Sequence, residues 1–250
     1  MSKNLKFIWF RTKIAMGYRF SLSGNTSELE SRFFPPINLP ENKNWSIGLI
    51  GLETYHTIPN IDSLNNKLYY SIDGKEKKSI SVPTGSYEIS SLNDFLKAHL
   101  GTENFALSAN NSTLKVKLFT KYRIDFTEEN TLAPLLGFES KVLHPKSSAG
   151  KTFESDTVVS IIRVNTIRVQ CNLVSQSFIN GESDHIIHEF FPNVEPGYKI
   201  IEVPSPPIYL PINMNRIDRI TVRLLDQDSR LINFRGETIF LALHIRSDGS

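Results

Sequence analysis

Apolar and polar residues alternate in short runs over the last third of the chain, and this period of two is typical of β-strands with one buried face. The alternation is strict at residues 167–173 and 220–224. A third run, residues 239–245, is apolar on one face but also carries Phe240 and Ala242 on the other. We expect that strand to be covered on both sides, by a second sheet or by another subunit. The pattern predicts a β scaffold.

Upstream, residues 45–55 predict a further strand, in which Gly48 and Gly51 indicate a bulge or close packing. Residues 33–40 contain three prolines and are expected to run extended as a connector, because proline lacks a backbone donor and restricts the residue before it. The long strand that leads into residues 167–173 is expected to bulge near Asn165, where its apolar positions change sides.

Between these all-β regions, residues 64–137 have a different pattern. A hairpin is predicted at residues 68–82. Residues 91–100 have apolar positions at helical spacing, with a capping box at Ser91 and Asp94 and a glycine at the end, and therefore predict a helix. Three further strands and a short helix are predicted at residues 105–108, 114–118, 122–126 and 131–136.

This order of hairpin, helix, strands and helix indicates an α+β unit with its own apolar face. We therefore predict a mainly β protein in which residues 29–63 and 141–250 form a discontinuous β-sandwich. Residues 64–140 form a small inserted α+β subdomain, and residues 1–28 form a basic N-terminal arm. The polar segment 141–156 is predicted to be the loop that leaves the insertion.

The N-terminal segment, residues 1–27, carries five cations and no acidic residue. Its longest apolar run is far shorter than the ~7–15 residue core of a signal peptide, and no segment approaches the ~18 apolar residues of a membrane span. We expect synthesis in the cytoplasm or nucleus and no membrane partner. The segment is either a disordered tail or an arm that orders on a partner. The residues assigned to that contact are Lys3, Lys6, Trp9, Phe10, Arg11, Lys13, Tyr18 and Arg19, with Phe20 as a further aromatic anchor.

Two motifs resemble ligand sites but lack essential positions. Residues 148–152 end like a phosphate-binding loop, but the glycine that this loop needs at its start is replaced by Pro145. His185 and His188 are three residues apart, and in a strand such side chains point to opposite faces. We predict neither a nucleotide site nor a metal site here.

A third motif, Asp226, Asp228 and Glu237, matches three positions of a calcium loop, but Leu231 occupies the position of the required glycine. A hairpin turn explains these acids better. Cys171 is the single cysteine and is expected to be an ordinary buried thiol. No catalytic set has local motif context, so we predict no enzyme, no cofactor and no metal. The net charge of +2 is too small for nucleic-acid binding by the whole chain, which leaves the basic arm for such a contact.

A series of segments carries a resemblance to a known family. Residues 130–138 close the inserted unit, and the others follow in order in the last third of the chain. They are Val169–Leu173, Asn180–Gly181, His185–Pro192, Lys199–Pro204, Tyr209–Ile212, Ile220–Asp226 and Phe234–Glu237. This ordered set resembles the minor capsid (penton) protein of Polinton/Maverick elements and the related adintoviruses, over residues 45–245.

The resemblance implies a jelly-roll fold, no enzyme activity and a place in the virion. It also implies homopentamers at the fivefold vertices of an icosahedral shell, in contact with a double-jelly-roll major capsid protein. Two alternatives stay open. A receptor- or carbohydrate-binding β-sandwich would use loop aromatics such as Tyr55, Tyr198 and Tyr209. An enzyme on the same scaffold would need converging polar residues, whereas the inward positions are apolar or cysteine.

Overall fold

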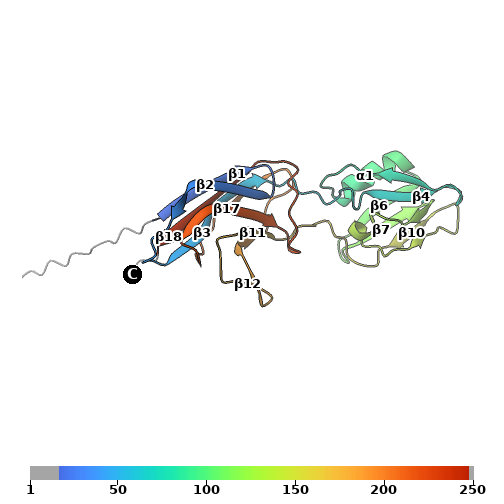
Figure 1. Ribbon diagram of the computed structural model, residues 1–250. Coiled ribbons are helices and arrows are strands. Elements are labelled where there is room, and N and C mark those ends of the chain that lie inside the picture. The colour runs from blue at the N-terminus through green and yellow to red at the C-terminus, as the bar shows by residue number, and fades with distance from the viewer. Residues whose placement is uncertain (1–16, 248–250) are drawn as a thin grey trace, which may run out of the picture.

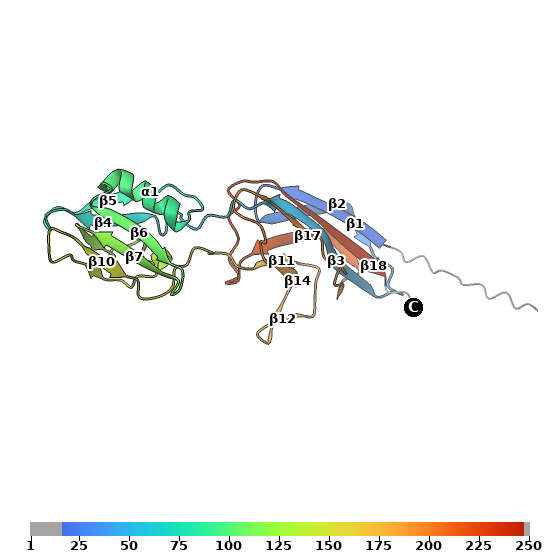
Figure 2. The same ribbon diagram turned by 180° about the vertical axis from the view of Figure 1, so that it is seen from behind.

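A computed structural model describes residues 17–247 as two lobes that are joined by two linkers (Figures 1 and 2). Most of the elements are antiparallel strands. The buried apolar side chains form two separate clusters, one in each lobe. We call the lobe that spans residues 61–161 the insertion lobe and the rest the sandwich lobe.

The sandwich lobe contains two sheets that face each other. In the first sheet the strand order is β1, β18, β3 and β15, and the short strand β16 also pairs with β3. The bounds are β1 Gly17–Gly24, β18 Ile239–Ser247, β3 Trp45–Tyr55, β15 Lys199–Glu202 and β16 Leu210–Pro211.

In the second sheet the order is β14, β11, β17 and β2. The bounds are β14 Ile186–Phe190, β11 Ile167–Cys171, β17 Arg216–Leu225 and β2 Glu28–Asn38, and a side hairpin is formed by β12 Ser177–Ile179 and β13 Glu182–Asp184. The chain passes between the two sheets after β1, β2, β3, β14, β16 and β17. A five-stranded and a four-stranded sheet with this order and these crossings form a jelly roll, which confirms the predicted fold class.

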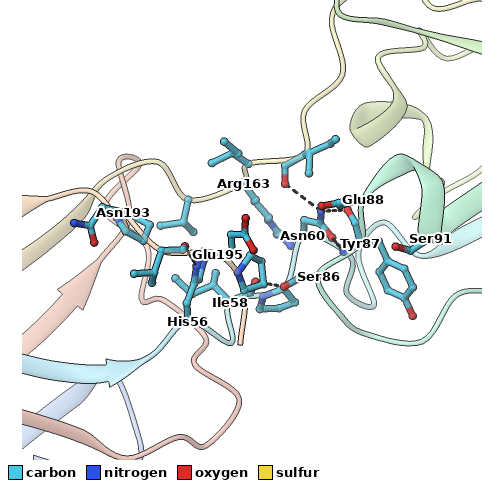
Figure 3. Close-up of a pocket in the computed structure, with 17 residues that line it drawn as sticks. His56, Ile58, Asn60, Ser86, Tyr87, Glu88, Ser91, Arg163, Asn193 and Glu195 are labelled. Atoms are coloured by element: carbon cyan, nitrogen blue, oxygen red, sulfur yellow. Dashed lines mark hydrogen bonds between the residues drawn. The ribbon is translucent and has the colours of Figure 1, made fainter. Parts of the chain in front are cut away.

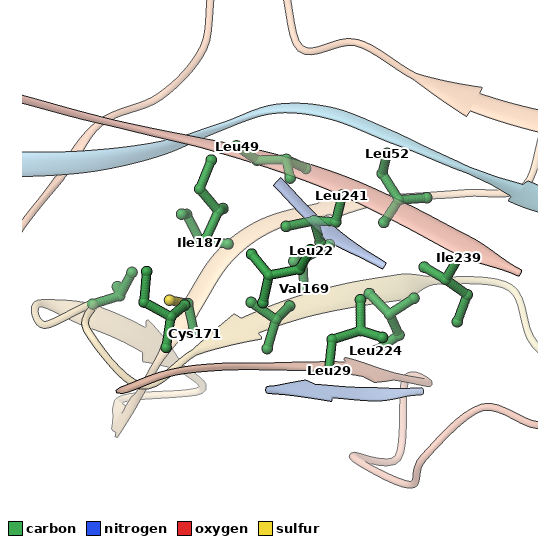
Figure 4. Packing of buried hydrophobic residues seen from close by; sticks show 14 of the residues in the cluster. Leu22, Leu29, Leu49, Leu52, Val169, Cys171, Ile187, Leu224, Ile239 and Leu241 are labelled. Atoms are coloured by element: carbon green, nitrogen blue, oxygen red, sulfur yellow. The ribbon is translucent and has the colours of Figure 1, made fainter. Parts of the chain in front are cut away.

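Apolar side chains from the two sheets interleave to form the core of the sandwich lobe (Figure 4). Leu241 comes from the first sheet, while Val169 and Leu224 come from the second. Cys171 is fully buried among them, as its place in an alternating strand predicts. The strict alternation of β11 and β17 therefore marks one face that is buried against the other sheet.

The glycines of β3 accompany a bulge, as predicted. Ala242 pairs with Gly51 and Leu243 pairs with Leu49, so Ile50 has no partner on β18. The extra residue allows Leu49 and Leu52 both to be buried, although strict alternation would place them on opposite faces. A Cβ atom at Gly48 would lie 2.8 Å from the carbonyl oxygen of Ile208, so a larger residue does not fit there.

The insertion lobe leaves the sandwich after β3 and returns before β11 (Figure 1). One of its sheets has the order β5, β4, β8 and β9, and the other has the order β10, β7 and β6. The strands are β4 Lys67–Ser71, β5 Lys78–Ser81, β6 Phe105–Asn110, β7 Lys115–Thr120, β8 Arg123–Asp125, β9 Val142–Leu143 and β10 Lys151–Glu154, and the helices are α1 Ile89–Leu100 and α2 Ala133–Leu136.

The predicted helix is present, but it begins earlier than its sequence pattern indicates. Glu88 is the N-cap and no side chain caps the helix, so the capping box at Ser91 and Asp94 is wrong. Ile89 is buried in the lobe's core, which requires the first turn to start before Ser91. Gly101 ends the helix as predicted, and its amide donates to the carbonyl of Lys97.

Residues 141–156, predicted to be a loop, contain the strands β9 and β10. These strands pair with β8 and β7, and Phe153 lies opposite Leu118. Apolar residues as far along the chain as Ile161 pack on the same core. The loop prediction was wrong because it relied on the polar composition of this segment. That composition instead reflects an edge strand, β10, whose side chains are largely exposed.

Two further predictions in the sandwich lobe are wrong. Residues 33–40 were expected to form a connector, but most of them belong to β2, which pairs with β17 at residues 28–32 and again at residues 37–38. Pro35 and Pro36 lie between these two paired parts, where the register shifts on an edge strand, so no bond between the strands needs the donors that they lack. The long strand with a bulge near Asn165 is absent, since β11 begins only at Ile167 and the residues before it form a linker.

The predicted arm is corrected at its C-terminal end. Tyr18 and Arg19 belong to β1, which pairs with β18. The Tyr18 ring centroid lies 5.8 Å from that of Trp45, and the Phe20 ring lies 5.5 Å from that of Phe33. These aromatic residues therefore pack against the chain's own core instead of anchoring it to a partner. The other assigned contact residues, Lys3, Lys6, Trp9, Phe10, Arg11 and Lys13, lie outside the described residues.

Candidate functional site

The two histidines of the sequence motif have different partners. His185 Nδ1 lies 2.6 Å from the carbonyl oxygen of Val174, whereas His188 Nε2 lies 2.9 Å from a carboxylate oxygen of Glu202. The two side chains diverge, but His188 lies on β14 whereas His185 precedes this strand, so the predicted single strand does not contain both. Among residues 17–247, no three His, Cys, Asp or Glu side chains gather closely enough to hold a metal ion. In the same range, no helix is long and apolar enough to cross a membrane.

The acidic motif at Asp226 forms a turn, as predicted. The Asp226 carboxylate accepts hydrogen bonds from the amides of Asp228 and Arg230 and from Nε of Arg230, each at 2.9 Å. Burial alone would raise the pKa of Asp226, but the hydrogen bonds from Arg230 and Asp228 outweigh burial and lower it. The carboxylate therefore holds the turn between Leu225 and Leu231, which form a β-bridge.

Two other candidate groups also have structural roles. Burial raises the pKa of Cys171 to about 11, so its thiolate, the reactive form, is scarce at neutral pH. In the segment 148–152, the Gly150 amide donates to the carbonyl of Ser147 in a turn that leads into β10. The left-handed backbone of Gly150, at a φ of 84°, explains why glycine occupies this turn.

A cleft of about 590 Å³ lies where the two lobes meet (Figure 3). It is lined by both linkers, by the chain that leads into α1 and by the loop that follows β14. Polar side chains around it include His56, Asn60, Glu88, Arg163 and Glu195.

Asn60 connects three of the segments that line the cleft. Its Nδ2 donates to the carbonyl oxygens of Tyr87, at 2.8 Å, and Ile161, at 3.1 Å, and its Oδ1 accepts from the Tyr87 amide. The side chain is buried, so these bonds form away from water. Asn60 carries no sequence signal of this role, because an asparagine after a proline is typical of an ordinary turn.

The other polar groups of the cleft also bind protein partners. Nδ1 of His56 lies 2.7 Å from the carbonyl oxygen of Val194. Arg163 forms an ion pair with Asp62, which links the linker before β11 to the start of the insertion lobe. Ser86 donates to the carbonyl oxygen of Ile58, at 2.6 Å. These contacts make the cleft a joint that fastens the two lobes to each other.

The outer face of the first sandwich sheet carries a group of exposed apolar side chains. In the register of this sheet, Ile201 of β15 and Phe240 of β18 lie on either side of Glu53 of β3. Their exposed fractions are 57% for Ile201 and 55% for Phe240. We define the outer apolar patch as Tyr55, Ile201, Val203 and Phe240, all of which are exposed.

The neighbouring part of this face is covered by the chain itself. The Tyr209 hydroxyl lies 2.8 Å from Nδ1 of His244, and the Arg246 guanidinium lies 3.7 Å from the centroid of the Tyr209 ring. The cover does not extend to Gly51, where an added Cβ would meet no atom within 4 Å. Within this chain nothing covers the outer side of β18 at Phe240, so cover by another subunit stays a prediction there.

The outer apolar patch contains little charge. Glu53 lies between its apolar residues and pairs with Lys199, with Nζ and Oε2 2.5 Å apart. Both side chains are about half exposed, so the pair is screened by solvent. Any partner on this face would meet mainly apolar side chains beside one neutralised pair.

The aromatic residues proposed for glycan binding are not brought together. Tyr55 and Tyr198 are exposed and lie close to each other, because Lys199 pairs with Tyr55. Tyr209 instead precedes β16, which pairs with β3 near Ile47 at the other end of the strand. Its ring is also occupied by His244 and Arg246. These three tyrosines therefore do not form a single site.

Comparison with known proteins gives an informative likeness among solved structures. No protein-family model matches the sequence. The search of curated proteins also finds no match. Among solved structures, the crystal structure of the selenomethionine-labelled mavirus penton protein is similar, with a TM-score of 0.50 and 12% sequence identity. The match covers 94% of this chain and 100% of that chain, so it extends over both lobes. At this identity the likeness shows a shared fold, the mostly antiparallel β architecture of a penton protein.

Proposed function

We propose that this chain is a structural minor capsid (penton) protein, which assembles as a homopentamer at the fivefold vertices of an icosahedral shell. The observation that carries the proposal is the likeness to the mavirus penton protein over 94% of the chain, insertion lobe included. The role is structural and not enzymatic. The sequence resemblance to Polinton/Maverick and adintovirus pentons supplies the fivefold number, the place in the virion and the double-jelly-roll major capsid protein as neighbour.

The outer apolar patch is the part of the surface that we assign to contact between subunits. A ring uses a heterologous interface, so this patch would meet a different surface on the next copy. Apolar side chains dominate the patch, and its single ion pair is already satisfied within the chain. The ring should therefore tolerate added salt, since salt screens charges but does not weaken apolar burial.

Light scattering of the purified full chain tests this assignment. Phe240→Asp would place an unpaired carboxylate in the buried contact, so we expect folded monomers, with folding checked by circular dichroism. Leu64→Asp is the matched control, because Leu64 is also an exposed apolar residue but lies in the insertion lobe. A pentamer that survives Phe240→Asp would refute the assigned contact. A wild-type monomer at every concentration would refute self-assembly away from the shell, and a stable trimer would favour a receptor-binding spike.

For the N-terminal arm we propose contact with neighbouring capsid subunits or with encapsidated nucleic acid, now limited to residues 1–16. Deletion of residues 1–16 should leave the thermal transition nearly unchanged and reduce incorporation into shells. Deletion of residues 1–24 should instead lower the transition, because it removes β1 from its pairing with β18. Binding of the arm to nucleic acid would weaken steeply with salt. Equal incorporation of the 1–16 deletion and the full chain would refute the role of the arm.

A further inference from the structure

A second concavity, of about 250 Å³, lies on the insertion lobe beside the β4–β5 hairpin. In Figures 1 and 2, β4 belongs to the part of this lobe that is remote from the sandwich lobe. The concavity is smaller than the ~300–1,000 Å³ of sites for drug-sized ligands, so it suits a single small group. The residues that line it are Tyr70, Ser71, Gly74, Lys75, Lys77, Arg123 and Asp125.

Strand register places the key side chains in one row. Ser71 of β4 lies opposite Arg123 of β8, and Asp125 lies opposite Tyr69, two residues along the same strands. Side chains on directly opposite residues of paired strands share one face of the sheet. Ser71 and Arg123 therefore lie side by side on the same face, with Asp125 next to them.

The hydroxyl of Ser71 is a buried polar group that forms no hydrogen bond with the described residues. The residue is only 7% exposed, and its hydroxyl has no hydrogen-bond partner within residues 17–247. The Asp73 carboxylate is nearby, but it accepts the amides of Lys75 and Glu76, which are the main causes of its lowered pKa. The Ser71 hydroxyl contributes least to the lowered pKa of Asp73, and it forms no hydrogen bond with that carboxylate. A buried hydroxyl without a partner is unusual in a folded protein and calls for an explanation, such as a ligand.

Two of the three cationic side chains at the concavity also have no ion-pair partner among the described residues. Lys77 is paired with Asp125, at 3.4 Å, and with Glu128. In the part of the chain that is described, the side chains of Arg123 and Lys75 form no ion pair or hydrogen bond. A guanidinium can bind a planar or tetrahedral oxyanion through two parallel hydrogen bonds. The Ser71 hydroxyl could then donate to the same group.

We propose that this concavity binds the oxyanion group, a carboxylate or a sulfate, of an acidic saccharide. Arg123 and Lys75 would neutralise the anion, and Ser71 would donate to it. Asp125 would accept a hydrogen bond from a neighbouring sugar hydroxyl, since a carboxylate has several acceptor positions. A mixed set of donors and one acceptor fits a sugar that carries both an acid group and hydroxyls.

The surrounding charges favour a short saccharide over a nucleic acid. Nucleic-acid binding relies on a stripe of cations that contacts successive phosphates. Here the cations form no such stripe, because Lys77 between them is paired with Asp125 and Glu128 and the Asp73 carboxylate lies beside Lys75. All residues of this site belong to the insertion lobe, so the binding proposal does not depend on assembly into a capsid. Only a role of the site in attachment to cells would rest on the proposed capsid function.

Binding to the full chain should be measured by calorimetry with sialyllactose, a sulfated disaccharide, inorganic sulfate and neutral lactose. We expect the acidic saccharides to bind more tightly than sulfate, and lactose not to bind. Arg123→Gln should weaken binding by about tenfold or more, and Ser71→Ala by several-fold. Lys117→Gln, at an exposed cation on β7, is the matched control and should bind as the wild type does.

Several outcomes would overturn the proposal. Lactose binding equal to that of sialyllactose, or binding that Arg123→Gln leaves unchanged, would exclude an oxyanion site here. Binding of sulfate alone would exclude the saccharide, and tighter binding of a DNA oligonucleotide that depends on Arg123 would identify nucleic acid instead. Arg123→Gln should leave the oligomeric mass unchanged, so failure of this site is distinguishable from failure of the pentamer.

Discussion

A pair of core substitutions should separate the stabilities of the two lobes. Leu118 and Leu243 are both fully buried, but Leu118 belongs to the apolar cluster of the insertion lobe and Leu243 to that of the sandwich lobe. The two clusters share no residue. We therefore expect Leu118→Ala and Leu243→Ala to destabilise different cooperative units.

The expected effect follows from the size of each cavity and of each lobe. Truncation of a fully buried leucine to alanine costs about 3 kcal/mol, in a range of roughly 2–5 kcal/mol. For a lobe of roughly 100 residues, this loss lowers the transition temperature by about 12–24 °C. For the larger sandwich lobe of roughly 150 residues, the same loss lowers it by about 6–12 °C. Leu118→Ala should therefore produce the larger shift.

Differential scanning calorimetry of the full chain would show the outcome. We expect two transitions, of which Leu118→Ala lowers one and Leu243→Ala lowers the other. Leu64→Ala, at an exposed position of the insertion lobe, is the control and should change stability by less than about 0.5 kcal/mol. A single transition that both core variants lower would show that the joint at the cleft couples the lobes into one unit, and the reasoning from separate cores would be wrong.

Three further predictions concern single side chains. Asn60→Ala should lower the free energy of unfolding, measured by urea denaturation, by about 1–3 kcal/mol, because it leaves backbone groups of Tyr87 and Ile161 without partners. The control Asn111→Ala should leave this free energy unchanged. Equal effects of the two substitutions would refute the role of Asn60. The pKa of Asp226 is lowered from 3.8, so its contribution to stability is present above that value and is lost as the pH falls through the lower, folded-state pKa. Asp226→Asn should therefore be less stable at neutral pH, and the difference should narrow in acid; a constant difference in pH titrations of stability would contradict this. Cys171 should react with a thiol reagent at pH 8 only after unfolding, because it is buried and burial raises its pKa to about 11. Rapid reaction of the native protein would show that the core opens.

The strands with strict alternation were predictable because their own side chains specify a buried face. This holds for β11, β17 and β18, whose inward positions are buried. β1 also alternates, through Tyr18, Phe20 and Leu22, but Arg19 and the four cations before this strand led to its interpretation as part of an arm. Its strand partner, β18, lies at the other end of the chain, so no local signal marks the pairing.

The candidate sites were less predictable, since they depend on register and on contacts between distant segments. Ser71 and Arg123 become neighbours only through the pairing of β4 with β8. Asn60 contacts Ile161 across the whole insertion lobe. The outer apolar patch combines Phe240 with Ile201, which are on strands separated by β3. A single sequence contains the residue types of these sites but not their placement.

The pairing of β1 with β18 has a consequence for the order of folding during synthesis. Gly24 pairs with Ile239, so the first strand must wait until nearly the whole described chain has been made. At ribosomal rates of about 5–20 residues per second, this interval lasts roughly 10–40 s. The insertion lobe instead pairs nearby strands, such as β4 with β5 and β6 with β7, and can close soon after it emerges. A nascent chain should therefore carry a folded insertion lobe between two unfinished halves of a jelly roll, and those halves are the segments that a chaperone would have to shield.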